Sequence, residues 1–249
     1  MSDCWADCLG DCSDKVSREH IVSKGLFDTQ GIYVQGFQWC MNEPKPIAVE
    51  GFTAKILCSK HNSELSRVDQ AGIETANVFR EAFRLSDVRE KMRPRIWARK
   101  KFRIDGYQLE RWFLKTLINV ACRGDRPLGS RAEYPGKPTQ ELVEIAFGLK
   151  QFSQKAGLYL MADIGEMPPR GDLFRIITAL QDDKHLAGAR FQFQGIRYLL
   201  CLDSTGARRG LRFMGRDGKA YEPSNLLFHP AKVNFDVAGR PSHTIEFSW

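Results

Sequence analysis

Two short pairs of cysteine and histidine residues constrain this chain more than any other feature of its sequence. Cys8 and Cys12 form the first pair, and Cys58 and His61 form the second. The members of each pair stand three or four positions apart, a spacing that lets both side chains reach one ion from a tight turn. Together they predict a Cys₃His site of the closed, structural kind that Zn²⁺ prefers. Such a site would add folding free energy to a segment too small to have much core.

Other cysteines leave the ligand set open. Cys4 and Cys8 repeat the spacing of Cys8 and Cys12, so Cys4 could replace one of the four ligands, as could Cys40. Cys122 and Cys201 stand in apolar stretches, and like Cys40 they are typical of small buried side chains. The acidic first residues do not resemble a signal peptide, and no apolar run is long enough to span a membrane. We therefore expect a cytoplasmic protein whose cysteines bind metal or lie in the core.

Oxygen ligands stand beside the two pairs. Glu19 and Asn62 carry the oxygen atoms that Mg²⁺ and similar hard cations prefer, and they would be poor zinc ligands. His20 follows Glu19, and an imidazole titrates close enough to neutrality to take a proton from water. Asp69 lies about two helical turns after Asn62 and could join the same cation.

These residues resemble a known family. Glu19-His20-Ile21-Val22, followed by Cys58-x-x-His61-Asn62, resembles the HNH or ββα-metal endonucleases, over about residues 4–72. The resemblance implies that His20 is the general base and that Glu19 and Asn62 hold a catalytic Mg²⁺ or Mn²⁺. It also implies a setting such as bacterial defence. The chain departs from the common pattern in its Cys-x₃-Cys spacing, in Ser23 where many members have Pro, and in lacking a third histidine.

Hydrophobic periodicity predicts an α+β fold with two parts. Residues 1–72 would form the zinc-containing ββα-metal module, and residues 73–249 a helical and then β-rich accessory domain. Within the second part, period-3.6 patterns predict helices over 106–121, after an N-cap at Thr139, and over 173–181 after an N-cap at Asp172. From Gly188 onward, alternating patterns broken by Gly, Pro, Asp and Asn predict short strands.

Charge is distributed unevenly along the chain. Residues 1–72 hold 7 Lys and Arg against 10 Asp and Glu, whereas the remainder holds 30 against 20. This excess favours a polyanionic partner such as nucleic acid, with DNA expected. The densest basic run also contains aromatic residues, a combination typical of surfaces that hold phosphates and stack on bases. Its candidate contact residues are Arg93, Arg95, Arg99, Lys100, Lys101 and Arg103.

Two classes of function remain open on the sequence. The first is a metal-dependent endonuclease that hydrolyses DNA, or RNA, with residues 73–249 binding nucleic acid, a partner protein or a regulatory ligand. The alternative is a non-catalytic, zinc-stabilised nucleic-acid-binding or interaction module. The presence of Glu19, His20 and Asn62 together favours the nuclease, because a purely structural zinc site needs none of them.

Overall fold

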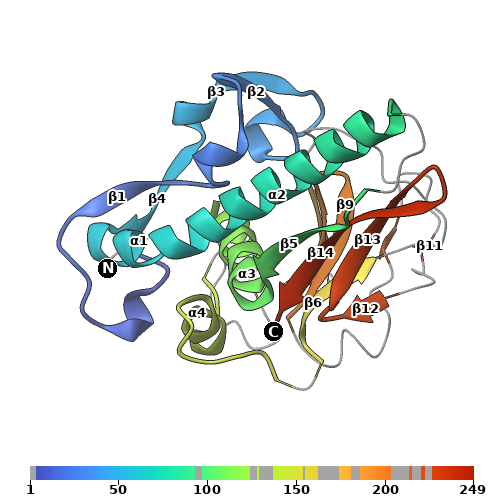
Figure 1. Ribbon diagram of the computed structural model, residues 1–249. Helices are drawn as coiled ribbons and strands as arrows, with labels where there is room; N and C mark the ends of the chain where they lie inside the picture. Colours follow the sequence, from blue (N-terminus) through green and yellow to red (C-terminus); the bar gives the residue numbers. More distant parts are fainter. Residues whose placement is uncertain are drawn as a thin grey trace.

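A computed structural model describes most of the chain. The described residues are 4–92, 97–123, 128, 137–153, 155–161, 174–180, 186–202, 213–214, 220–221 and 226–249. They form a mixed α+β structure, as expected (Figure 1). The α-helices among them are α1 (Ser59–Glu64), α2 (Ser66–Glu90), α3 (Gly106–Arg123) and α4 (Gln140–Ala146). Among the described helices, none combines the length and apolar character needed to cross a membrane.

The first part of the chain is a pair of antiparallel strands followed by a helix. β1 (Val16–His20) pairs with β4 (Thr53–Cys58), and α1 begins directly after β4. A hairpin of β2 (Gly31–Val34) and β3 (Lys45–Ala48) stands in the connection between them. This order of elements is the one expected of a ββα module, while its assignment to the HNH fold stays a prediction.

The β-rich end contains two larger sheets. The order in the five-stranded antiparallel sheet is β12-β6-β9-β8-β7, and in the three-stranded sheet it is β13-β14-β5, with β5 parallel to β14. The bounds are β5 (Lys100–Asp105), β6 (Gly157–Met161), β7 (Arg175–Leu180), β8 (Leu186–Phe193), β9 (Ile196–Cys201), β10 (Phe213–Met214), β11 (Ala220–Tyr221), β12 (Leu226–Phe228), β13 (Lys232–Val237) and β14 (Arg240–Ser248). The strands expected after Gly188 are therefore confirmed.

One helix prediction is wrong. Arg175–Leu180 is strand β7, paired along its length with β8, whereas the sequence pattern predicted a helix over 173–181. Consecutive β-branched residues (Ile176, Ile177 and Thr178) suit an extended strand with a ready partner, and this outweighs a short helical period. The expected cap Asp172 lies outside the described residues. The cap at Thr139 is confirmed, because its hydroxyl accepts a hydrogen bond from the amide of Leu142.

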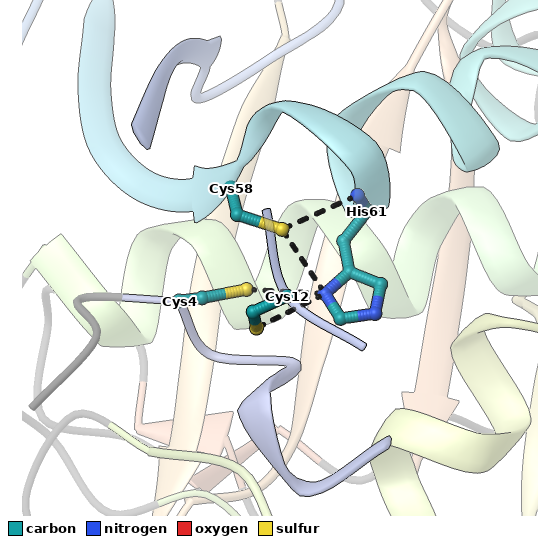
Figure 2. Close-up of side chains that lie close together, drawn as sticks. All are labelled: Cys4, Cys12, Cys58 and His61. Atoms are coloured by element: carbon teal, nitrogen blue, oxygen red, sulfur yellow. Dashed lines mark hydrogen bonds between the residues drawn. The ribbon is translucent and has the colours of Figure 1, made fainter. Parts of the chain in front are cut away.

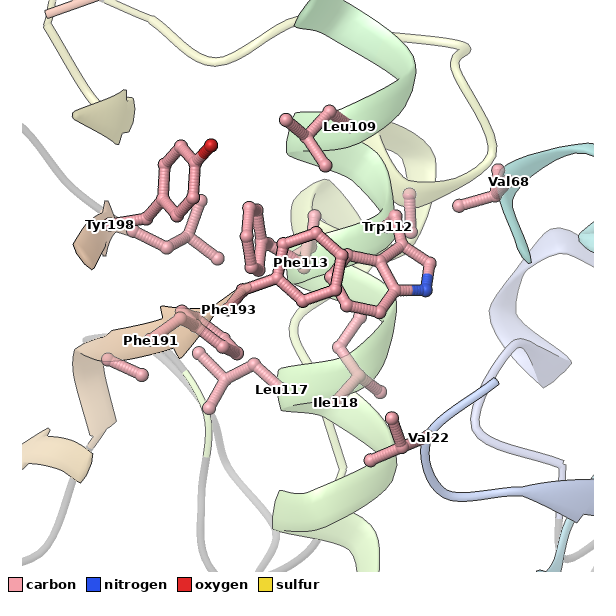
Figure 3. Packing of buried hydrophobic residues seen from close by; sticks show 14 of the residues in the cluster. Val22, Val68, Leu109, Trp112, Phe113, Leu117, Ile118, Phe191, Phe193 and Tyr198 are labelled. Carbon is pink, nitrogen blue, oxygen red and sulfur yellow. The ribbon is translucent and has the colours of Figure 1, made fainter. Parts of the chain in front are cut away.

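Helix α3 forms the centre of the core. The residues that carry its predicted helical period are buried, except Val120, which is partly buried: Leu109, Trp112, Phe113 and Leu117. Trp112 and Phe113 pack against Phe191 and Phe193 of β8 (Figure 3). On the other side of α3 lie Val22 and Val68 of the N-terminal part (Figure 3). One hydrophobic cluster thus joins the two parts that the sequence separated at position 72.

Helices α2 and α3 approach each other closely at Gly72. A Cβ atom on Gly72 would lie 2.5 Å from the indole of Trp112, so only glycine leaves room for this ring. The position predicted as a domain boundary is therefore inside α2 and against the core helix. This contact fixes the N-terminal module onto the element that carries Lys115 and Asn119, which matter for the site described next.

Candidate metal centre

The N-terminal segment folds back onto the start of α1. Cys4 and Cys12 flank a short 3-10 helix (Asp7–Leu9), and the left-handed backbone of Gly10 and Asp11 reverses the chain between them. Cys58 ends β4 and caps α1, its sulfur accepting a hydrogen bond from the amide of His61. Four side chains from these two segments point toward one another (Figure 2).

The four side chains have the spacing of ligands around one ion. The Nδ1 atom of His61 lies 3.3 Å from the sulfur of Cys58, 3.4 Å from that of Cys4 and 3.6 Å from that of Cys12. All four ligand atoms lie within 4.8 Å of one another. Tetrahedral zinc with ordinary bond lengths separates its sulfur and nitrogen ligands by about 3.5 Å. The cluster of Cys4, Cys12, Cys58 and His61 therefore fits a metal such as zinc. A closed site with four protein ligands would stabilise the fold by joining the N-terminal segment to the start of α1.

The thiols of this cluster differ in acidity. Burial raises the pKa of Cys58, but hydrogen bonds from the amides of His61 and Ser13 outweigh it and lower that pKa to about 6. Burial raises the pKa of Cys4 to about 12. Because zinc binds thiolates, Cys58 is the ready ligand and Cys4 must release its proton when a metal binds.

The expected ligand Cys8 lies outside this cluster. Its side chain is exposed on the 3-10 helix, and Cys4 takes its place. Cys4 is held by its neighbour Trp5, whose indole packs edge-on against Phe147 and donates a hydrogen bond to Asn119. The repeated four-residue spacing signalled that Cys4 was available, but only this buried anchor selects it. Cys40 is buried elsewhere and is not one of the four.

The carboxylate of Glu19 forms an ion pair that the sequence did not predict. Its carboxylate is almost fully buried, and Oε1 lies 2.5 Å from the Nζ atom of Lys115 on α3. The same oxygen faces the side-chain amide of Asn119 at 3.4 Å. Burial raises the pKa of Glu19, and the Lys115 ammonium opposes that rise. Oε1 of Glu19 therefore already has a cationic partner, and a divalent cation held by Glu19 stays a prediction.

His20 and Asn62 lie apart from that contact. His20 is the last residue of β1, and strand alternation directs it away from Glu19. Its Nε2 atom has no hydrogen-bond partner among the described residues, and the nearest carboxylate oxygen is Oε2 of Glu50, at 3.9 Å. Burial lowers the pKa of His20, which favours the neutral ring. Asn62 is half-buried on α1, and in the described part of the chain its amide is not hydrogen-bonded to Glu19.

The described part of the basic run is largely engaged within the protein. Arg99 donates a hydrogen bond to Asn234, Lys100 pairs with Glu81, and Lys101 pairs with Glu246. Arg103 is exposed on β5, and Arg93 and Arg95 lie outside the described residues. The run therefore offers less uncompensated positive charge than its sequence suggests.

Comparisons with known proteins give no family for this chain: no family model, no curated protein and no solved structure matches it.

Proposed function

We propose that this chain is a zinc-stabilised ββα module that binds nucleic acid and does not hydrolyse it. The observation that carries the absence of hydrolysis is the 2.5 Å contact between Lys115 and Glu19, with Lys115 only 1% exposed. A nuclease of the expected kind needs that carboxylate for a divalent cation that also reaches the substrate. Here the carboxylate faces α3 and is shielded from solvent. Zinc at the Cys₃His cluster would hold the module together without taking part in any reaction.

Binding is supported by the outer face of the β1–β4 pair. Arg18 and His20 alternate with the buried Glu19 along β1 and so lie on the opposite face. The β1–β4 register shifts between Ser17 and Glu19, and Lys55 of β4 follows Ala54, the residue paired with Glu19. Arg18 and Lys55 are exposed, and among the described residues neither forms an ion pair. Nearby, Lys24 is paired with Glu50, so the uncompensated charge on this face is positive. Such cations bind phosphates through counterion release, whatever the base sequence.

A charge-reversal experiment tests the binding. Fluorescence anisotropy with labelled duplex DNA, single-stranded DNA and RNA should show affinity that falls as salt is raised. Arg18→Glu/Lys55→Glu should weaken binding by about tenfold or more, because two phosphate contacts become repulsions. The matched control is Lys91→Glu/Arg240→Glu, which reverses two exposed charges. Lys91 follows the end of α2, and Arg240 begins β14, whose Ser242 accepts a hydrogen bond from Arg89 of α2. Figure 1 shows that this end of α2 is the one farthest from β1. If the two double variants bind with equal affinity, or if the affinity does not depend on salt concentration, this face is not the nucleic-acid-binding surface.

The second candidate is the metal-dependent endonuclease, DNA or RNA being its substrate. It is favoured by His20, which ends β1, has a pKa lowered by burial, and has an Nε2 atom without a hydrogen-bond partner in the described structure. Supercoiled plasmid and structured RNA, incubated with Mg²⁺, Mn²⁺ or EDTA, decide between the two functions. We expect no cation-dependent cleavage. Cleavage that disappears in His20→Ala, with zinc content unchanged, would establish the nuclease and overturn the proposal.

A further inference from the structure

The ammonium group of Lys115 lies between two carboxylates. Its Nζ atom is 2.5 Å from Oε1 of Glu19 and 2.5 Å from Oδ2 of Asp69. Glu19 comes from β1, Asp69 from the first turn of α2, and Lys115 from the middle of α3. Two buried or half-buried carboxylates repel each other unless a cation stands between them, and here the protein supplies that cation itself.

Further polar atoms surround the same position. The hydroxyl of Ser23 donates to Oδ1 of Asp69 at 2.6 Å and accepts a hydrogen bond from the indole of Trp112 at 2.9 Å. Two carboxylates and a hydroxyl form the oxygen-rich environment that hard divalent cations prefer. The cluster thus offers oxygen ligands of the kind that Mg²⁺ or Mn²⁺ binds, but an ammonium lies between its two carboxylates.

Lys115 is not free to leave this position. It lies on the helix that forms the centre of the core, and both its stem and its charge are removed from solvent. Withdrawing it would leave Glu19 buried without a counter-charge, which is strongly unfavourable. A tethered ammonium also needs no free ion from solution.

We infer that Lys115 takes the place of a divalent cation, so that the zinc-loaded chain binds no Mg²⁺ or Mn²⁺ at Glu19 and Asp69. The corollary is that shortening Lys115 turns this cluster into a divalent-cation site. The inference depends on this cluster alone and holds whether or not the chain binds nucleic acid.

Manganese binding tests the corollary. Electron paramagnetic resonance of free Mn²⁺, titrated into zinc-loaded protein, should show no uptake by the natural chain and about one bound ion in Lys115→Ser, consistent with a site built from two carboxylates. Adding Asp69→Asn to that variant should weaken the binding by about tenfold or more. The matched control is Lys101→Ser, which removes an exposed lysine paired with one carboxylate, that of Glu246. No uptake by folded Lys115→Ser would overturn the corollary.

A measurement on the natural chain tests the inference without any substitution, and decides it if Lys115→Ser does not fold. Proton–nitrogen NMR of the lysine ammonium groups should show a slowly exchanging Lys115 signal that millimolar Mg²⁺ does not shift and Mn²⁺ does not broaden. The inference would be wrong if this signal is lost or strongly broadened in the natural chain but not in Glu19→Gln. That result would mean that a divalent cation bound to Glu19 displaces the ammonium.

Discussion

The indole of Trp5 donates a hydrogen bond of 3.1 Å to the side-chain oxygen of Asn119. The amide of the same asparagine donates to the backbone carbonyl of His20 at 3.2 Å and faces Glu19. Because Trp5 directly follows the ligand Cys4, one side chain of α3 connects the metal-binding segment to the end of β1. Hydrogen bonds through Asn119 thus join the segment that carries Cys4 to the strand that carries Glu19 and His20.

Replacing Trp5 tests this link. Trp5→Phe keeps an aromatic ring against Phe147 but leaves the buried oxygen of Asn119 without its donor. We expect a loss of about 1–3 kcal/mol in the free energy of unfolding, the cost of an unsatisfied buried acceptor. Urea unfolding of zinc-loaded protein measures it. Trp39→Phe, at a residue 37% exposed, is the control and should change stability by less than about 0.5 kcal/mol.

The presence of Cys4 in the cluster, in place of the expected Cys8, gives a second prediction. Cys4→Ser should lose tight zinc binding, because a hydroxyl is a poor substitute for a thiolate, whereas Cys8→Ser should keep about one zinc per chain. Metal content after gel filtration measures both. The assignment would fail if Cys8→Ser lost zinc while Cys4→Ser retained it.

Removal of the Lys115 charge should destabilise the fold strongly. Lys115→Met leaves Glu19 buried without its counter-charge, and we expect a cost of about 3–5 kcal/mol at neutral pH. Lys115→Met/Glu19→Gln should recover most of this loss, because the more deeply buried carboxylate is then uncharged and only the partly exposed Asp69 has lost its counter-charge. Chemical unfolding of the two variants and of Glu19→Gln completes a double-mutant cycle. A double variant as unstable as Lys115→Met would assign the loss to packing of the lysine stem instead.

The same variant should respond to pH in a defined direction. Burial already raises the pKa of Glu19, and the Lys115 ammonium works against this rise, so its removal raises the pKa further. When the pKa of a carboxyl is higher in the folded than in the unfolded state, folding takes up a proton at pH values between the two, and lowering the pH stabilises the fold. As pH is lowered from neutrality to about pH 5, the free energy of unfolding of Lys115→Met should therefore increase relative to that of the natural chain. Unfolding curves at several pH values measure this, and a deficit independent of pH would contradict it.

The close approach of α2 and α3 predicts an unfavourable alanine. In an isolated helix Gly72→Ala would be stabilising by about 1 kcal/mol. Here the added Cβ would meet the Trp112 indole at 2.5 Å, so we expect a net destabilisation of about 1–3 kcal/mol. Thermal unfolding measures it, with Gln70→Ala, at an exposed position on the same helix, as the control. A stabilised Gly72→Ala would show that the two helices separate easily.

Local sequence patterns correctly predicted the elements whose tertiary contacts favour the same conformation. The stripe of Leu109, Trp112, Phe113 and Leu117 indicated a helix because its period is intrinsic to the segment, and the cap at Thr139 is equally local. Residues 175–180 were misassigned because a short helical period was given more weight than their β-branched run at 176–178, and because pairing with β8, which begins at Leu186, favours the extended strand.

The sequence by itself predicted that Cys12, Cys58 and His61 belong to a cluster that could bind a metal, since ligand spacing within a turn is a local property. Only the tertiary structure decided that Cys4 completes it, because the selection depends on where Trp5 is buried. Only the tertiary structure, too, placed Lys115 against Glu19. Those two residues lie on different elements that the core brings together, and the charge of a buried carboxylate is governed by whatever cation packing places beside it.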